Sequence, residues 1–302
     1  MPEPQAYLNG RFLPASQAAV SVWDGGFVQG TTVAEQLRTF GGKLFQLEAH
    51  IERLGRSLDL VGVDPGIRLE RLAVIAQELT AANHALLARG DDLGLTMFVT
   101  PGPYEIPGSP ASPTVCLHTL PLRFHLWADK YAGGESMATT DIVQVSARCW
   151  PPELKCRSRM HYYLADRQAR LRIPGSRALM TDEDGFVTEA TTANVVLCDE
   201  QGGLVIPHIE KILPGISLGV LMGLAEKLGI PCTERDLTVA DCLAASEIFL
   251  TSTSPCMLPV LKINGQPIGG GSPGIMFGRF LSAWNELVGL DIVEQARRFR
   301  SR

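Results

Sequence analysis

A lysine in the second half of the chain stands where its amine could act as a nucleophile. Lys155 follows an apolar stretch, has Leu154 beside it, and precedes a predicted helix. A lysine at a partly buried strand end can lose its proton through desolvation, and the neutral amine can then attack an aldehyde. The alternative interpretation is an ordinary surface lysine, the more common role of this residue type. The position of Lys155 within the ordered set of motifs described below favours the first interpretation.

A second motif is suited to binding a phosphate. Gly215-Ile216-Ser217 opens a predicted helix, so its backbone amides and the Ser217 hydroxyl can donate hydrogen bonds to an anion at the helix N-terminus. A simple helix cap would use the same residues.

Three motifs occur in one order: Leu154-Lys155-Cys156-Arg157-Ser158-Arg159, Glu189-Ala190-Thr191-Thr192-Ala193-Asn194, and Leu213-Pro214-Gly215-Ile216-Ser217. Their order and spacing resemble the fold-type-IV (class IV) pyridoxal-phosphate aminotransferases, which include branched-chain and D-amino-acid transaminases and aminodeoxychorismate lyase. The likeness runs from Tyr7-Leu8-Asn9-Gly10 to about Val260. Each motif is weak alone, and the shared order makes the match specific.

The resemblance implies a role for each motif. Lys155 would hold pyridoxal 5'-phosphate as a Schiff base and shuttle a proton between the substrate and the cofactor in a ping-pong transamination. Glu189 would face the pyridine nitrogen and keep it protonated. Arg53, in His50-Ile51-Glu52-Arg53-Leu54, would bind the phosphate through its guanidinium. The implied cofactor-binding residues are Arg53, Lys155, Arg159, Glu189, Ile216, Ser217, Ser252 and Thr253.

The substrate side departs from the family pattern. Many relatives carry Arg-Gly after the Val-Thr strand end, whereas here Val99-Thr100 is followed by Pro101-Gly102, so one common carboxylate clamp is missing. Arg38, on a strand that lines the pocket in relatives, is the first candidate to replace it, ahead of Arg123 and His125. The predicted substrate-binding residues are Gln36, Arg38, Thr192 and Ser254.

A second departure follows the lysine. Many relatives have a tyrosine four or five residues on, which supports the phenolic oxygen of the cofactor, but this chain has Arg159 and Met160 there. Arg159 could donate to that oxygen instead, or Tyr162 or Tyr163 could reach it. Helix packing is the alternative role for both tyrosines.

The elements that position these residues predict two domains of α/β (α+β) class. Residues 1–121 form a small N-terminal domain, 122–134 a linker, and 135–302 a larger C-terminal domain that carries the lysine and combines mixed sheets or a pseudo-barrel with helices. Helices are predicted at Leu47 to Val61, Ile67 to Arg89, Arg159 to Leu171, Ile216 to Leu228, Thr238 to Ala245 and Gly274 to Val288. Thr238 and Asp241 are placed as a capping pair at the start of the fifth helix.

Alternation and turn residues predict the strands. Those expected are Tyr7 to Leu13, Ala18 to Val22, Thr32 to Phe40, Lys43 to Phe45, Leu93 to Thr100, Val115 to Leu120, Met137 to Ala147, Arg177 to Met180, Glu247 to Thr251 and Pro259 to Ile263, with hairpins turning at Asp184-Gly185 and Gln201-Gly202-Gly203. A proline-rich surface loop is expected from Pro101 to Pro113.

Composition excludes several classes of protein. Lys plus Arg number 27 against 32 Asp plus Glu, without a long run of one sign, so nucleic acid is not an expected partner. No signal peptide or membrane-spanning stretch is evident. Seven scattered cysteines without a CxxC pair favour reduced thiols over disulfides or a metal site. These features predict a soluble cytoplasmic protein with no metal.

Three functions stay open at this stage. The first is an aminotransferase that moves an amino group between an amino acid, or related amine, and a keto acid. The second is an aminodeoxychorismate lyase, which forms 4-aminobenzoate and releases pyruvate. The third is an inactive family member that serves as a binding protein, against which the retention of Arg53, Lys155 and Glu189 argues. Relatives are homodimers, so the resemblance also implies a homodimer.

Overall fold

The computed structural model describes residues 3–104, 112–199 and 201–301, and part of the predicted loop from Pro101 to Pro113 therefore lies outside the described residues. The chain divides into two compact units. Unit 1 consists of Met1–Leu122 together with Leu154–Ser158, and unit 2 of Arg123–Glu153 with Arg159–Arg302. The segment with Lys155 thus groups with the first unit, whereas the sequence interpretation assigned it to the C-terminal domain.

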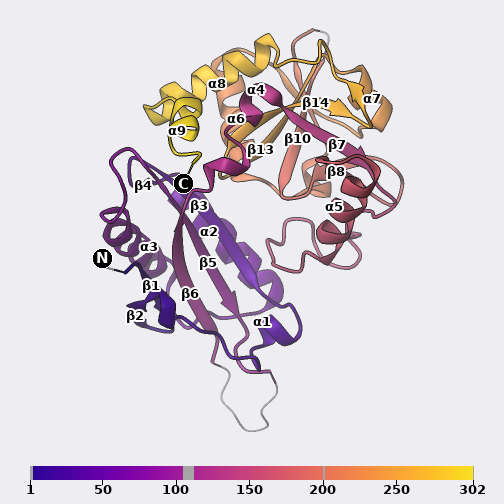
Figure 1. The fold of residues 1–302 in the computed structure, drawn as a ribbon. Helices are drawn as coiled ribbons and strands as arrows, with labels where there is room; N and C mark the ends of the chain where they lie inside the picture. The colour runs from indigo at the N-terminus through magenta and orange to yellow at the C-terminus, as the bar shows by residue number, and fades with distance from the viewer. Residues whose placement is uncertain (1–2, 105–111, 200, 302) are drawn as a thin grey trace. The chain divides into compact units, whose positions relative to one another are not determined.

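Unit 1 contains an antiparallel sheet (Figure 1). Its first hairpin turns at Asn9-Gly10, both in the left-handed region with φ of 47° and 89°, which suits a two-residue turn. Within the described residues its strand order is β2 (Arg11–Pro14), β1 (Gln5–Leu8), β6 (Thr114–Pro121), β5 (Leu93–Thr100), β3 (Val33–Phe40) and β4 (Lys43–Leu44).

Two predicted strands of unit 1 are wrong. The strand predicted from Tyr7 to Leu13 is the hairpin of β1 and β2, because the left-handed Asn9 and Gly10 turn the chain. Residues 18–22 are not a strand: the 3-10 helix η1 (Ala15–Gln17) precedes them and the short helix α1 (Gly25–Val28) follows. The Asp24 carboxylate caps α1 by accepting from the Gly26 amide at 2.7 Å and also accepts from the Thr114 hydroxyl. A capping aspartate followed by two glycines outweighs the weak alternation of this segment.

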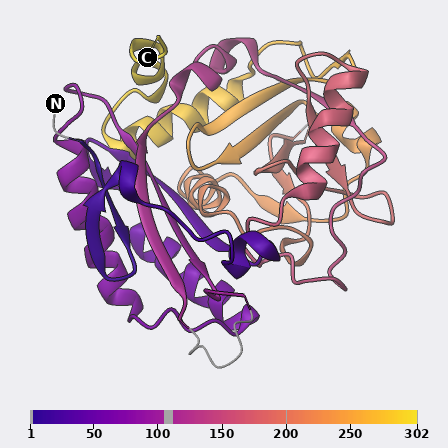
Figure 2. The same cartoon turned by 60° about the horizontal axis from the view of Figure 1, so that its bottom comes forward.

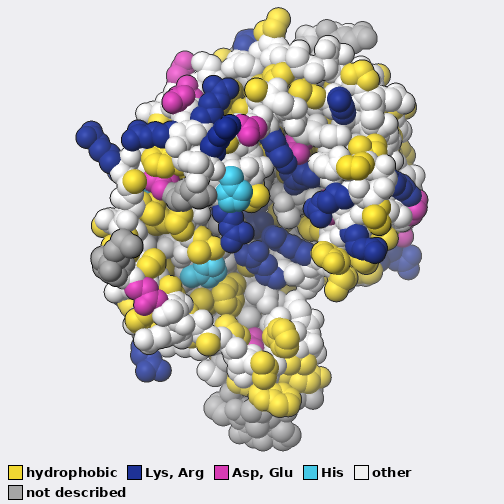
Figure 3. Space-filling model, viewed as in Figure 1, with side chains coloured by type: hydrophobic (Ala, Val, Ile, Leu, Met, Phe, Trp, Pro, Cys, Tyr) yellow, Lys and Arg dark blue, Asp and Glu magenta, His cyan; other side chains and the backbone are white. Residues whose placement is uncertain are grey.

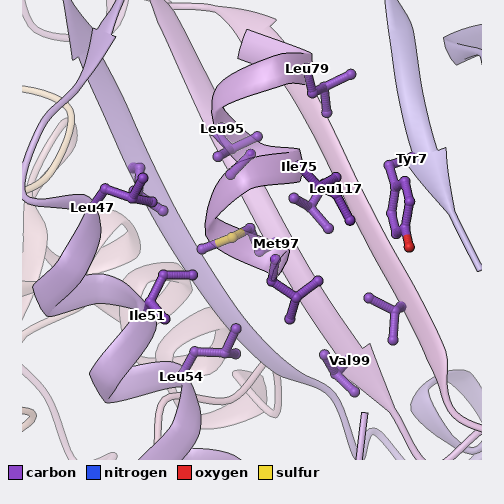
Figure 4. Close-up of a cluster of buried hydrophobic side chains, with 14 of the residues drawn as sticks. Tyr7, Leu47, Ile51, Leu54, Ile75, Leu79, Leu95, Met97, Val99 and Leu117 are labelled. Carbon is purple, nitrogen blue, oxygen red and sulfur yellow. The ribbon is translucent and has the colours of Figure 1, made fainter. Parts of the chain in front are cut away.

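Two helices cover one face of the unit 1 sheet, as Figures 1 and 2 both show. They are α2 (Leu47–Val61) and α3 (Leu69–His84). Figure 4 shows Leu54 of α2 and Ile75 of α3 pointing toward Met97 of β5, and all three side chains are buried. Since neighbouring strand residues alternate between faces, this core fixes which residues of β3 point toward the helices.

The sheet of unit 2 closes on itself. Its described strands run in the order β12 (Cys232–Glu234), β11 (Leu204–Ile206), β10 (Ala193–Cys198), β13 (Glu247–Ser252), β14 (Cys256–Ile263), β7 (Glu135–Thr139), β8 (Arg177–Thr181) and β9 (Val187–Ala190), with β15 (Gln266–Pro267) beside β14. Because β9 pairs back with β10, the sheet is barrel-like, as the predicted pseudo-barrel required.

Helices surround this sheet. Those described are η2 (Phe124–Leu126), α4 (Lys130–Gly133), α5 (Met160–Arg172), η3 (Ile209–Lys211), α6 (Ile216–Lys227), α7 (Val239–Ala244), α8 (Ile275–Val288) and α9 (Ile292–Arg298). Thr238 and Asp241 form the expected capping box of α7. The predicted strand from Met137 to Ala147 ends at Thr139, and the residues beyond it leave the sheet. Among the described residues, no helix is long and apolar enough to cross a membrane.

Candidate active site

The backbone of Lys155 is anchored to β3 and α2 of unit 1. Its carbonyl accepts from the Ala34 amide at 3.0 Å, its own amide donates to Ser57 Oγ at 3.2 Å, and Cys156 forms a β-bridge with Val33. Alternation from this bridge puts the Lys155 side chain on the face of β3 opposite to the helices. The side chain is partly buried. These anchors set the position of the amine relative to β3.

Gln36 and Arg38 share that face of β3. Gln36 is partly buried, and its Oε1 accepts from the Thr96 hydroxyl at 2.7 Å. Arg38 is 1% exposed, its Nε donates to the Thr39 carbonyl, and its guanidinium lies over the Phe40 ring at 3.9 Å. The structure therefore brings these two predicted substrate residues onto the face that carries Lys155.

A buried cluster of charged side chains lies on the other face of β3. Glu35 accepts from Arg53 in a two-pronged pair, with Nε to Oε1 at 2.7 Å and Nη2 to Oε2 at 2.8 Å, and from His50 Nδ1 at 2.7 Å. None of the three is more than 2% exposed. Glu35 binds the guanidinium of Arg53 at Nε and Nη2, so the edge that carries Nη1 points away from the carboxylate. A carboxylate on β3 thus sets the orientation of the arginine.

The pKa shifts in this cluster follow from burial and pairing. Burial alone would raise the pKa of Glu35, but the hydrogen bonds from Arg53 and His50 outweigh it and lower that pKa to about 2. Burial lowers the pKa of His50, an effect that Glu35 opposes and that the charges of Arg53 and Lys155 reinforce. Glu35 is therefore an anion at neutral pH, which compensates the buried guanidinium.

In unit 2, three buried polar residues form a row across neighbouring strands. Asn194 of β10 pairs with Glu189 of β9 on one side and with Thr251 of β13 on the other. Each of the three is 5% exposed or less. Directly opposite residues share one face of a sheet, so the row extends over about two strand spacings, roughly 10 Å. Glu189 marks one end of a polar strip on this face.

Glu189 accepts two neutral donors at the same oxygen. Gln144 Nε2 lies 2.5 Å from Oε1, and the Tyr162 hydroxyl donates to the same atom. Burial and the charge of Glu189 raise the pKa of Tyr162, so the phenol keeps its proton and acts as the donor. Tyr162 thus contacts Glu189, a role that differs from the two considered from the sequence, namely binding the phenolic oxygen of the cofactor and helix packing.

The N-terminus of α6 sits against the middle of the row. Asn194 Nδ2 donates to the Leu213 carbonyl at 2.8 Å, and a Cβ at Gly215 would lie 2.0 Å from Asn194 Oδ1. Gly215 is the N-cap and supplies no side-chain acceptor for the first amides of α6. Ile216 and Ser217 therefore begin the helix as the sequence predicts, with amide donors suited to an anion.

The residues present fit a phosphorylated pyridine aldehyde. A cradle that only glycine allows stands at the α6 N-terminus, and Thr251 Oγ1 on the same strip is buried without a hydrogen-bond partner in the described part of the chain. Glu189, at the other end of the strip, supplies a carboxylate suited to a ring nitrogen. An anion donor site and a carboxylate on one face match the two ends of such a ligand.

The predicted site residues Ser252, Thr253 and Ser254 lie at the C-terminal end of β13 and in the turn that follows it. Ser252 Oγ donates to the Thr192 carbonyl at 3.1 Å, which brings these two residues together, while Thr253 and Ser254 lie in the turn to β14. Thr192 and Cys256 both adopt left-handed backbone conformations, with φ of 64° and 65°. Such strain in non-glycine residues occurs often at functional sites and is consistent with a ligand-binding turn.

The remaining candidates lie elsewhere in unit 2. Arg159 is the N-cap residue of α5, partly exposed, and lowers the pKa of His161 through its charge, second to burial. Tyr163, one residue after Tyr162 on α5, is 65% exposed. Arg123 and His125 are exposed and flank the start of η2.

Several residues of these clusters were not among the predicted site residues. Glu35 and Gln144 are single polar residues inside strand or loop patterns, and no spacing rule marks them. Thr251 opens the run Thr251-Ser252-Thr253-Ser254, which resembles a phosphate loop of the family, but only the three residues after it were predicted as site residues. Asn194 belongs to a quoted motif, but its contact with α6 depends on strand pairing across residues far apart in the chain. The available signal for Glu35 was its place between Val33 and Leu37 on the apolar face of a predicted strand, where a charged residue needs a partner.

The chain matches the class IV aminotransferase family (Amino-transferase class IV) over residues 32–263 and therefore belongs to that family. It is 31% identical to a D-alanine aminotransferase of Bacillus licheniformis, with 88% of this chain and 90% of the relative covered. A D-alanine aminotransferase of Staphylococcus haemolyticus is 27% identical, with 94% and 98% covered. The protein is thus an aminotransferase enzyme, as the resemblance implied.

Solved structures show the same fold. The branched-chain amino acid aminotransferase of Escherichia coli superposes with a TM-score of 0.87 at 21% identity, covering 95% of both chains. A second branched-chain amino acid aminotransferase, solved with pyridoxamine 5'-phosphate and originating from T.th., gives 0.85 at 21% identity, covering 96% of this chain and 95% of that one. The predicted fold-type-IV architecture is confirmed.

Proposed function

We propose that this protein is a pyridoxal-phosphate-dependent aminotransferase that moves an amino group from an amino acid to a keto acid by a ping-pong mechanism. The polar strip of unit 2, with Glu189 at one end and the α6 N-terminus beside Asn194, is the observation that carries the proposal. The relatives named above are aminotransferases, which supports amino-group transfer over the lyase reaction and over an inactive binding protein. When bound, the cofactor withdraws electrons from the bonds at the substrate α carbon.

Lys155 is the proposed catalytic residue. Its amine would hold the cofactor through the aldehyde and, once released by the amino donor, would hold and move a proton at the substrate α carbon. The two backbone hydrogen bonds to Ala34 and Ser57 hold the lysine segment while the side chain moves.

The proposed phosphate ligands come from three elements. The amides of Ile216 and Ser217 would donate from the α6 N-terminus. Ser252, at the end of β13, and Thr253, in the turn after it, would offer hydroxyls, and Arg53 would contribute the guanidinium edge that faces away from Glu35. Arg159, at the start of α5, is the proposed partner of the cofactor's phenolic oxygen.

Gln36 and Arg38 are the proposed substrate residues of unit 1, joined by Thr192 and Ser254 of unit 2. The Thr96 hydroxyl fixes the Gln36 amide, and Arg38 supplies a positive charge on the same face of β3. A carboxylate of the amino donor is the group that such a cation attracts.

Absorbance spectroscopy tests the proposal. Protein loaded with pyridoxal phosphate should change from the spectrum of the lysine-bound aldehyde to that of the aminated cofactor when D-alanine or a branched-chain amino acid is added, and pyruvate or 2-oxoglutarate should reverse it. Lys155→Ala should bind the cofactor without the first spectrum. Release of pyruvate from aminodeoxychorismate without any keto acid would favour the lyase instead.

A homodimer is the proposed assembly. Val22, Trp23 and Phe27 are 66%, 68% and 74% exposed beside and on α1, and Figure 3 shows apolar side chains gathered around that part of unit 1. Large exposed apolar clusters mark interfaces, and a second copy of this chain is the proposed occupant. Sedimentation equilibrium should give twice the chain mass, and Phe27→Glu should shift the protein toward monomer.

A cytoplasmic location is also proposed. None of the seven cysteines, all within the described ranges, is in a disulfide, as expected for a reducing compartment. Fractionation of cells that produce the protein should recover it with cytoplasmic markers.

A further inference from the structure

Glu189 is held by two side chains that the proposed function does not use. Tyr162, on α5, and Gln144, in the segment after β7, both donate to Oε1 of the carboxylate. A carboxylate oxygen has two lone-pair sites, so these donors fill Oε1 and direct Oε2 toward any further partner. The carboxylate is therefore fixed in rotation as well as in position.

The two donors are themselves oriented. Gln144 Oε1 accepts from the Val145 amide at 3.1 Å, which turns Nε2 toward Glu189, and Nε2 also approaches the Tyr162 hydroxyl at 3.3 Å. The backbone amide of Gln144 donates to the Thr181 carbonyl of β8 at 2.7 Å, which fixes the segment after β7 to the sheet. His161 packs on the Tyr162 ring with centroids 4.0 Å apart. Each member of the network thus has its hydrogen-bonding geometry set by another.

We propose that Tyr162 and Gln144 are positioning residues that orient Glu189 toward the ring nitrogen of the cofactor. The inference rests on the proposed function, since it assumes that Glu189 faces that nitrogen. Because both donors are neutral, they fix the carboxylate without cancelling its negative charge. In the proposed function this carboxylate faces a protonated ring nitrogen.

The test compares the affinities of two ligands that differ at one position of the ring. Pyridoxal phosphate and its analogue with the ring nitrogen replaced by C–H are titrated into cofactor-free protein and followed by absorbance. Tyr162→Phe should weaken binding of pyridoxal phosphate about tenfold, the size of a lost hydrogen bond to a charged group, and change binding of the analogue less than about twofold. Gln144→Leu should likewise weaken binding of pyridoxal phosphate more than binding of the analogue. This second variant keeps the test valid if Tyr162→Phe folds poorly.

Tyr163→Phe is the matched control, because Tyr163 lies next to Tyr162 on α5 and is 65% exposed. It should leave both affinities unchanged. Equal loss for both ligands in Tyr162→Phe and Gln144→Leu, or no loss for either, would overturn the positioning role. Glu189→Gln separates the two hypotheses: if it fails to distinguish the ligands, the proposed role of Glu189 is wrong, whereas if it distinguishes them and the other variants do not, only the positioning role is wrong.

Discussion

Two buried glutamates on strands, one in each unit, have opposite kinds of partner. Glu35 of β3 accepts from a guanidinium and an imidazole, whereas the donors at Glu189 Oε1 in β9 are a phenol and an amide. The first carboxylate is compensated by a cation of the protein. The second accepts from two neutral donors at its Oε1 atom.

This difference assigns the two carboxylates different functions. A buried acid paired with a buried arginine stabilises the folded state mainly by avoiding an unpaired charge, so Glu35 serves the fold and the orientation of Arg53. The phenol and the amide at Glu189 Oε1 hold that carboxylate in one orientation and carry no charge, which suits a group that acts on a bound ligand. Glu189 is accordingly the one expected to act on a ligand.

Of the two glutamates, Glu189 should matter more for catalysis, so Glu189→Gln should have the larger effect on activity. Replacing the anion by a neutral amide removes the partner of a protonated ring nitrogen, and activity should fall about 10²- to 10³-fold, as for the loss of one preorganised electrostatic group. The unfolding free energy should change little. Steady-state kinetics with an amino donor and a keto acid, beside urea unfolding, measure both. Full activity in this variant would contradict the assignment.

Glu35→Gln should show the reverse pattern. The change leaves the Arg53 guanidinium buried without its anion, so the unfolding free energy should drop by about 3 to 5 kcal/mol. Urea unfolding of the cofactor-free protein checks this. Glu52→Gln, at an exposed position of the same helix as Arg53, is the control and should be near neutral.

The dependence of the unfolding free energy on pH should reveal the contribution of Glu35. The pKa of Glu35 is lowered to about 2 in the folded protein from an ordinary value of 4.5, so its contribution to stability is present above pH 4.5 and is lost as the pH falls toward 2. The loss amounts to about 3 kcal/mol over this window. Unfolding at a series of pH values should show this component in the natural chain, and its persistence in Glu35→Gln would exclude Glu35 as the source.

The smallest effects on binding and stability are expected at two glycines, Gly215 at the N-cap of α6 and Gly219 inside α6. Gly215→Ala places a Cβ against Asn194 Oδ1 and should weaken cofactor binding about tenfold, because the α6 N-terminus must shift away from the strip. Gly219→Ala meets nothing within 4 Å and lies inside the helix, so it should raise the unfolding free energy by about 0.5 to 1 kcal/mol and leave binding unchanged. Equal affinities in the two variants would remove the α6 N-terminus from the phosphate site.

The sequence predicted what depends on local pattern. Apolar spacing located α2, and the Thr238–Asp241 pair located the start of α7, because both signals lie within a few residues. Local pattern failed at Ala18 to Val22, where capping by Asp24 decides the structure, and beyond Thr139, where alternation continues although the chain leaves the sheet.

The candidate site was predictable only in part for the same reason. Lys155, Glu189 and the α6 N-terminus stand in motifs, so a resemblance could locate them. Tyr162 and Gln144 become partners of Glu189 only through the packing of α5 and of the segment after β7 against β9, which no short-range pattern encodes. Strand pairing likewise brings Asn194 beside Thr251.

The central claim is that the amine of Lys155 binds the cofactor aldehyde, and borohydride trapping tests it most directly. Reduction of the protein loaded with pyridoxal phosphate makes the bond permanent, and peptide mass mapping then identifies the labelled residue among the six lysines of the chain. We predict one equivalent of label on Lys155, which an added amino donor prevents. Label on another lysine, or a label that resists the amino donor, would contradict the account.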